Sequence, residues 1–114
     1  MRMWGVDVKI LCRQHLLGEH LEMHMFAGAI KKKISLAGYI KKGLVNPRMI
    51  KIRHDALVTE MLRRRWNHKS KLDMDCSQLP DLPIDVKMHE KELLARCDNC
   101  NNCNIINLQI RGSE

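Results

Sequence analysis

The stretch that most constrains the fold is residues 7–33, where apolar residues recur at helical spacing. They occupy positions 10, 11, 17, 21 and 25, and would line one face of a long helix. Asp7 is suited to cap its N-terminus, and Lys31, Lys32 and Lys33 suit its C-terminal end, where cations interact favourably with the helix dipole. The sequence therefore predicts a chain built around one long helix.

Two shorter helices complete the expected fold. One is predicted at about 54–66, with Asn67 as its stop, and another at about 86–96, capped by Asp85. Only four residues are aromatic, so the core must be built from Leu, Ile, Val and Met, a composition that favours helices over sheets. We expect an all-α, compact, single-domain protein of about three helices with a short Cys-rich C-terminal tail.

The remaining segments are punctuated by glycine, proline and serine. Residues 34–51 predict a loop with short ordered pieces, and residues 69–84 predict a linker. Apolar alternation over 105–110 would allow a short strand near the C-terminus. The expected organisation is a helical domain at 1–72, with 73–114 forming a linker, a short helix and a Cys-rich tail packed on it.

Charge divides the chain in the same place. The net charge is +7, but residues 1–72 hold 16 Lys/Arg against 5 Asp/Glu, and residues 73–114 hold 4 against 8. A basic half favours a polyanionic partner, because binding releases condensed counterions, although a merely solvated basic face is the alternative. No apolar run approaches the roughly 18 residues of a membrane span, and no signal peptide is visible. We therefore expect a cytoplasmic protein with no membrane partner.

The densest polar stretch suggests acid–base chemistry. On a helix, His15, Glu19 and Glu22 follow one another at spacings of four and three, so they share one face. Gly18 lies four residues before Glu22 and would leave that carboxylate accessible. A carboxylate beside an imidazole suits proton transfer, but the same pair is also an ordinary helix-surface interaction.

Several segments, in one order, resemble the phage-type pyrimidine-dimer DNA glycosylases and their bacterial relatives. Residues 13–20, Glu22 and 26–29 are similar to the family's first helix, and residues 53–68 to a later one. The resemblance to the bacterial relatives extends to four further segments, Met1-Arg2-Met3-Trp4, Gly38-Tyr39-Ile40, Gly43-Leu44-Val45 and Asn67-His68-Lys69-Ser70. The resemblance covers about residues 1–72.

This resemblance implies a mechanism. In the family, the N-terminal α-amine attacks C1′ of a damaged nucleotide to form an imine, a glutamate assists, and β-elimination breaks the strand. It implies Met1, Glu22 and His15 as the catalytic residues. Met1 is expected to be retained because Arg2 follows it, and a retained Met1 lies as far from Glu22 as the family's processed terminus lies from its glutamate. An α-amine suits the attack because its ordinary pKa is about 8, against about 10.4 for lysine.

The implied partner is damaged or abasic double-stranded DNA, bound by a monomer, with no cofactor needed for the chemistry. Leu21 and Met25 replace arginines that hold DNA in the phage enzyme, and its aromatic-rich C-terminus is missing, which leaves the lesion open. The candidate DNA-binding residues are Arg2, Gln14, His20, Lys31, Lys32, Lys33, Arg63 and Arg64. Two alternatives stand beside the glycosylase: a non-catalytic nucleic-acid-binding protein, and a nuclease that uses His15 and Glu22 without an imine.

The C-terminal tail has metal-like spacing. Cys97, Cys100 and Cys103 are separated by two residues each, and thiolates at such intervals can converge on zinc. Three thiolates are one ligand short, so Cys76, His89 or water would have to complete a structural zinc site. Unliganded thiols are the alternative. Cys12, on the first helix, is interpreted as a small buried apolar residue.

Overall fold

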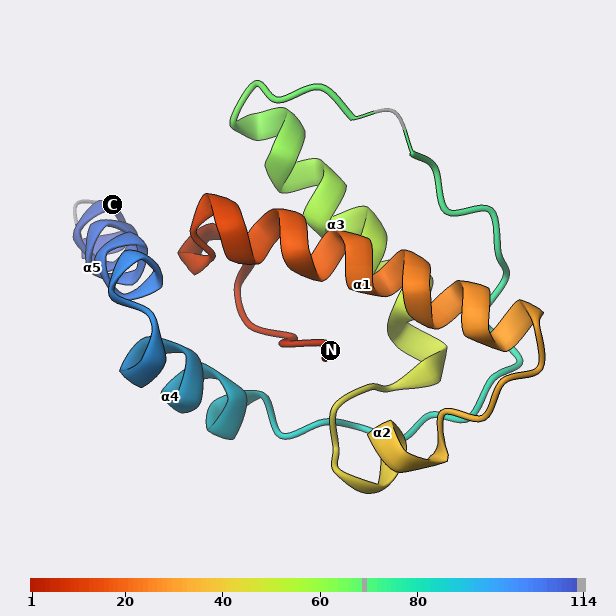
Figure 1. The fold of residues 1–114 in the computed structure, drawn as a ribbon. Coiled ribbons are helices and arrows are strands. Elements are labelled where there is room, and N and C mark those ends of the chain that lie inside the picture. Colours follow the sequence, from red (N-terminus) through yellow and green to blue (C-terminus); the bar gives the residue numbers. More distant parts are fainter. Residues whose placement is uncertain (69, 113–114) are drawn as a thin grey trace.

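The computed structural model describes residues 1–68 and 70–112, with side chains through residue 110 (Figure 1). Its described part is all helical and contains no strand, which confirms the predicted fold class. The elements are η1 (Val8–Ile10), α1 (Arg13–Lys31), α2 (Ala37–Lys41), η2 (Pro47–Met49), α3 (Ile50–Arg63), α4 (Val86–Arg96) and α5 (Asp98–Gly112). The five α-helices exceed the three predicted, and none of those described is long and apolar enough to cross a membrane.

The core lies where α1 packs against α3 and the N-terminal segment. Leu16 and Phe26 of α1 and Leu57 of α3 are fully buried, and each such side chain contributes about 1.5–3 kcal/mol relative to exposure. Met3 and Trp4 are buried as well, so the N-terminal segment is part of the core and not a loose end. Figure 1 shows this segment running beneath α1.

The first long helix is shorter than the predicted 7–33. Asp7 caps only the single turn of η1, after which Leu11 and Cys12 are extended and α1 begins. The backbone groups at this break are satisfied by distant partners: Arg64 Nη2 donates to the Leu11 carbonyl at 2.7 Å, and the Cys12 N–H donates to a cysteine thiol of α5 at 3.2 Å. These tertiary hydrogen bonds replace the intrahelical ones that local periodicity predicts.

The helix predicted at 54–66 corresponds to α3 (Ile50–Arg63), which begins and ends a few residues earlier. Pro47 occupies the first position of η2, where its fixed φ is pre-organised for a helical turn that leads directly into α3. At the other end, Arg65 adopts a left-handed φ of 65°, and the next N–H donates to the carbonyl five residues earlier at 2.9 Å. This hydrogen-bonded reversal ends α3, so Asn67 is not the stop.

The two C-terminal helices differ in how well local sequence predicts them. α4 has the predicted bounds, and its N-cap Asp85 accepts the Met88 N–H at 3.1 Å. The predicted strand at 105–110 is wrong, because these residues belong to α5. Cys100, Cys103 and Asn107, spaced by three and four, form the buried or half-buried side of α5 that packs on η1, whereas most of the alternating apolar residues remain exposed.

The predicted linker 69–84 has no helix among its described residues. Leu72 and Cys76 are nevertheless buried, so the linker is anchored to the core at both positions. Lys69, in the linker, and residues 113 and 114, in the predicted tail, lie outside the described residues. The proposed division into 1–72 and 73–114 therefore stays a prediction, although Leu93 of α4 is fully buried against the rest of the molecule.

Candidate active site and thiol–histidine cluster

A pocket of about 320 Å³ opens where the N-terminus, α1 and the end of α4 meet. We call it the N-terminal pocket. It is lined by Met1, Arg2, Trp4, Gln14, His15, Gly18, Glu19, Glu22 and Arg96. The structure thus brings all three predicted catalytic residues, Met1, His15 and Glu22, to one cavity.

A buried ion pair fixes the N-terminal segment beside α1. Glu19, fully buried, is bound in a two-pronged arrangement by Arg53 of α3, with Nε–Oε2 at 2.6 Å and Nη2–Oε1 at 2.9 Å. The same carboxylate accepts the Trp4 N–H at 3.2 Å, and Arg53 donates to the Val6 carbonyl at 2.7 Å. Glu19 therefore positions the chain and is not free for proton transfer.

Glu22 lies one turn further along α1, in a different environment. The Arg2 N–H donates to its Oε2 at 3.5 Å, and no atom crowds the space above Gly18 within 4 Å of where a Cβ would stand. Burial raises the pKa of Glu22, against the lowering effect of the Arg2 N–H and of the nearby terminal ammonium. This carboxylate can exchange protons with a group in the pocket.

The basic residues predicted to contact DNA are more constrained than expected. Arg2 pairs with Glu92 of α4 at 2.9 and 3.2 Å and lies over the Trp4 ring at 4.3 Å. Arg64 binds Glu60 at 2.6 Å as well as the carbonyls that precede α1. Both side chains mainly stabilise the fold. Arg63, also paired with Glu60, is exposed and keeps access to solvent.

Lys31, Lys32 and Lys33 are exposed at the C-terminal end of α1. Arg63 and Arg64 lie at the opposite end, because Arg64 contacts the turn just before α1 begins. With a rise of 1.5 Å per residue, the length of α1 separates the two groups by about 28 Å. The predicted basic residues therefore form two patches and not a single continuous one.

The other two predicted DNA contacts also lie apart. Gln14 is exposed and lines the N-terminal pocket. His20 is outside that lining and instead contacts His68, with the two Nε2 atoms 3.0 Å apart.

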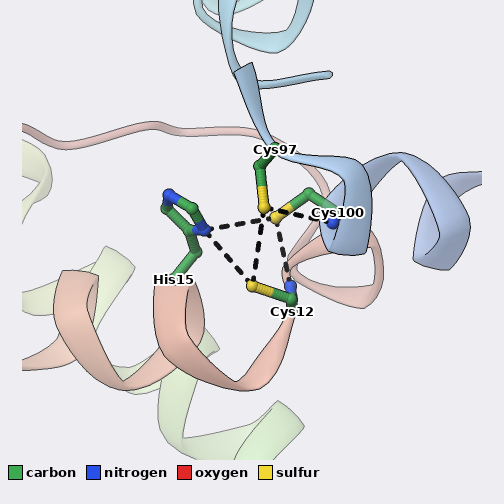
Figure 2. A group of neighbouring side chains, drawn as sticks. All are labelled: Cys12, His15, Cys97 and Cys100. Carbon is green, nitrogen blue, oxygen red and sulfur yellow. Dashed lines mark hydrogen bonds between the residues drawn. The ribbon is translucent and has the colours of Figure 1, made fainter. Parts of the chain in front are cut away.

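A second cluster borders the pocket at the N-terminal end of α1 (Figure 2). Cys12, His15, Cys97 and Cys100 form this thiol–histidine cluster, and their ligand atoms all lie within 4.8 Å of one another. His15 Nδ1 is 3.2 Å from the Cys12 Sγ and 3.5 Å from the Cys100 Sγ, and the Cys12 and Cys97 sulfurs are 3.9 Å apart. The cluster joins α1 to the junction of α4 and α5.

The membership of this cluster differs from the predicted set of metal ligands. Cys97 and Cys100 are in the cluster, but Cys103, one turn further along α5, is not. The suggested fourth ligands do not belong either, since Cys76 is buried elsewhere in the core and His89 Nδ1 contacts the Trp4 carbonyl at 3.1 Å.

The other two members are His15 and Cys12, which is buried as predicted. The spacing Cys12-x2-His15, matching that of Cys97-x2-Cys100, was the sequence signal that could have identified this pair.

The pKa values of the cluster residues shift in different directions. Burial raises the pKa of the Cys97 thiol, but hydrogen bonds from the Cys100 backbone and the neighbouring thiols outweigh it, so the net shift is downward. Burial raises the pKa of the Cys100 thiol well above its ordinary value. Burial, followed by the charge of Arg96, lowers the pKa of His15, which leaves this imidazole neutral at pH 7. A neutral imidazole can coordinate zinc directly, whereas Cys100 would have to release its proton on binding.

Comparison with known proteins assigns the chain to a family. The model of the pyrimidine dimer DNA glycosylases matches residues 1–74. The chain belongs to this family. Membership of a DNA glycosylase family identifies DNA as the class of substrate. No curated protein and no solved structure matches the chain.

The glycosylase match ends before α4 and α5, yet both helices contribute to the site. Arg96 lines the N-terminal pocket, Glu92 holds Arg2, and Cys97 and Cys100 complete the thiol–histidine cluster. The pocket of this glycosylase is therefore closed on one side by a segment outside the family match.

Proposed function

We propose that this protein is a DNA glycosylase with AP-lyase activity, in which the α-amine of Met1 attacks C1′ of a damaged nucleotide. The observation that carries the proposal is that Met1 and Glu22 line one pocket, with the terminal ammonium close enough to lower the pKa of Glu22. An amine and a carboxylate must share a substrate atom to cooperate, and a common pocket supplies that proximity.

The proposed steps account for each bond and proton. The amine nitrogen bonds to C1′ as the bond between C1′ and the base breaks, and the base leaves with a proton. Transfer of the amine's remaining proton to the ring oxygen O4′ breaks the C1′–O4′ bond and gives an imine. Removal of a C2′ proton then forms the C2′–C3′ double bond and breaks the C3′–O bond, which expels the 3′ phosphate. Glu22 is proposed to carry these protons, because its raised pKa brings it closer to neutral pH.

His15 has a different proposed role. Its Nδ1 is directed at the thiols of Cys12 and Cys100, so we propose that it binds a structural zinc with Cys12, Cys97 and Cys100 and is not the general base. In a tetrahedral site with Zn–S of 2.3 Å and Zn–N of about 2.05 Å, sulfurs lie about 3.8 Å apart and S–N pairs about 3.6 Å apart. The observed 3.9, 3.2 and 3.5 Å are close to these values.

Borohydride trapping on abasic duplex DNA tests the imine. We expect the protein to become covalently linked to DNA, because borohydride reduces an imine to a stable amine. Acetylation of the N-terminus should abolish trapping, since an amide nitrogen is not nucleophilic. A sample mock-treated without the acetylating reagent, matched in DNA binding, is the control.

The outcome also separates the alternatives. A nuclease acting through His15 and Glu22 would cleave with a blocked terminus, and a non-catalytic binding protein would neither cleave nor be trapped. Cleavage of abasic DNA at full rate by the blocked protein would therefore overturn the proposed mechanism.

A further inference from the structure

A group of four histidines lies outside the lining of the N-terminal pocket. His20 and His24 project from α1, His54 from α3, and His68 from the segment that follows α3. We call them the four-histidine cluster. One ligand nitrogen from each lies within 4.8 Å of all the others. We propose that this cluster binds a divalent transition-metal ion, with zinc as its occupant.

The spacing of the nitrogens supports coordination. Nε2 of His20 is 3.0 Å from Nε2 of His68, and Nε2 of His54 is 3.1 Å from Nε2 of His24. Zinc bound tetrahedrally by imidazoles at about 2.05 Å would hold its nitrogens about 3.3 Å apart. Both close pairs are therefore within a few tenths of an ångström of the separation that the metal would impose.

The contacts of His54 direct one ring nitrogen toward the other imidazoles. Its Nδ1 lies 2.8 Å from the Asp55 Oδ1, and the carboxylate can only accept, so Nδ1 carries a proton. Its Nε2 lies 3.1 Å from the His24 Nε2 and 3.2 Å from the Ser70 carbonyl. With Nδ1 protonated, Nε2 is the nitrogen that a metal in the cluster would bind.

Asp55 also holds His54 as the carboxylate partner of a metal ligand does. A metal-bound histidine usually donates its other N–H to a carboxylate, which orients the ring and makes it a stronger ligand. Here the Asp55 Oδ1 contacts the His54 Nδ1 at 2.8 Å and also accepts from the Lys51 Nζ at 3.2 Å.

The donor set agrees with this geometry. Four imidazole nitrogens without a thiolate suit zinc and its neighbours among the divalent transition metals.

The position of the cluster indicates a structural role. All four ligands come from the chain, which closes the coordination sphere and leaves no open position for a substrate. His68 and the Ser70 carbonyl hold the start of the segment 64–85, which has no helix among its described residues. A metal here would fasten that segment to α1 and α3, where long unstructured connections are otherwise uncommon in compact domains.

Zinc content measured on the purified full chain after exposure to zinc and dialysis tests the proposal. We expect two zinc ions per chain in the parent and one in the variant that combines His20→Gln with His68→Gln. Met25→Gln is the matched control, because it adds the same side chain to an exposed position of α1 and should keep both ions.

A spectroscopic measurement keeps the test independent of folding in the histidine variant. With Cys97→Ser and Cys100→Ser, cobalt added to the chain should still give the visible bands of a tetrahedral nitrogen site, without thiolate charge-transfer absorption. Asp55→Asn should weaken zinc binding at this site by about 10–100-fold.

The zinc and cobalt measurements can overturn either metal proposal without the other. A cysteine variant that binds neither zinc nor cobalt, while the histidine variant keeps the zinc content of the parent, would show that the four histidines form only a hydrogen-bonded network. The converse pattern, in which the cysteine variant keeps the zinc content of the parent and the histidine variant binds none, would overturn the thiol–histidine site and leave this one standing. Neither result depends on whether the protein cleaves DNA.

Discussion

Glu19 and Glu22 illustrate how neighbouring residues of one helix acquire different roles. Both carboxylates lie on α1 and line the N-terminal pocket. Glu19 is neutralised by the two-pronged contact with Arg53, and removing one partner of such a buried pair typically costs about 3–5 kcal/mol. Glu22 has no arginine partner of this kind, and its half-buried carboxylate has a raised pKa. The residue available for chemistry is therefore the one that the ion pair leaves free.

Glu22→Gln should separate binding from chemistry. Glutamine keeps the size of the side chain but cannot ionise, so we expect strand cleavage at abasic sites to fall by a factor on the order of 10² or more. Binding to the same DNA should change little, and single-turnover cleavage with an anisotropy titration measures the two. Met25→Gln on the exposed side of α1 is the control. A variant with undiminished cleavage would remove Glu22 from the mechanism.

The parent enzyme should also show the raised pKa of Glu22 in its pH profile. A carboxyl group with a raised pKa becomes protonated at a higher pH than usual. Activity that needs the carboxylate is then present above this pKa and lost as pH falls through it. We expect the acidic limb of kcat/KM to lie above the ordinary carboxyl range of about 4.3, and to be absent from any residual activity of Glu22→Gln.

At the scale of elements, α4 and α5 complete a site that belongs mainly to other parts of the chain. Their contacts with it are Glu92 to Arg2, His89 to the Trp4 carbonyl, and Cys100 to the Cys12 N–H. Each joins a C-terminal helix to the N-terminal segment or to the start of α1. The two helices thus hold the N-terminal segment against α1, and the thiol–histidine cluster joins them to the start of α1.

Cys12→Ser should weaken the attachment of α4 and α5 to the start of α1. A serine hydroxyl does not replace a thiolate ligand, so we expect one zinc ion fewer per chain and a lower Tm, because a bound metal stabilises only the folded state. Limited proteolysis should then cut more rapidly between α3 and α4. Cys103→Ser is the matched control, since Cys103 lies outside the cluster, and it should keep its zinc and its Tm.

A strong chelator should remove both zinc ions from the parent protein and lower its Tm at least as far as Cys12→Ser does. Zinc loss from the Cys103 variant but not from the Cys12 variant would instead show that the tail, as its spacing suggests, binds the metal on its own.

At the scale of the whole molecule, exposed cations that could attract a polyanion lie near both ends of α1. The exposed lysines 31–33 lie at one end of α1 and Arg63 at the other, so a duplex spanning both would be held at two points about 28 Å apart. Arg2 and Arg64 are engaged in internal contacts and contribute less directly. Electrostatic attraction to DNA should therefore depend on the exposed side chains more than on the total charge.

Lys32→Ala should lower the salt dependence of DNA binding. Removing one cation that neutralises a phosphate reduces the slope of log K against log salt by about 0.9 for duplex DNA. Titrations between about 50 and 200 mM salt measure this slope. Lys91→Ala, an exposed lysine of α4, serves as control and should leave it unchanged. An unchanged slope with Lys32→Ala would show that this end of α1 does not bind the phosphates.

The sequence by itself determined those features of the protein that depend on residues close together in the chain. Helical spacing and the Asp85 cap were enough to predict the all-α fold and the bounds of α4, and the succession of motifs was enough to indicate the family. These signals are readable because capping and periodicity act within a few residues. The break before α1 and the helical state of 105–110 were not readable in this way, since contacts between distant segments decide them.

Only the tertiary structure decided which side chains share a site. Cys12 and Cys97 are 85 positions apart in sequence, and their sulfurs meet because α5 packs on the turn before α1. The four histidines come together only through the packing of α1 on α3 and the return of the segment after it. The short spacings, such as those of Cys97-x2-Cys100 and of His20 and His24, were visible in the sequence. Which of these short motifs meet in space was not, because local patterns do not specify which helix faces pack together.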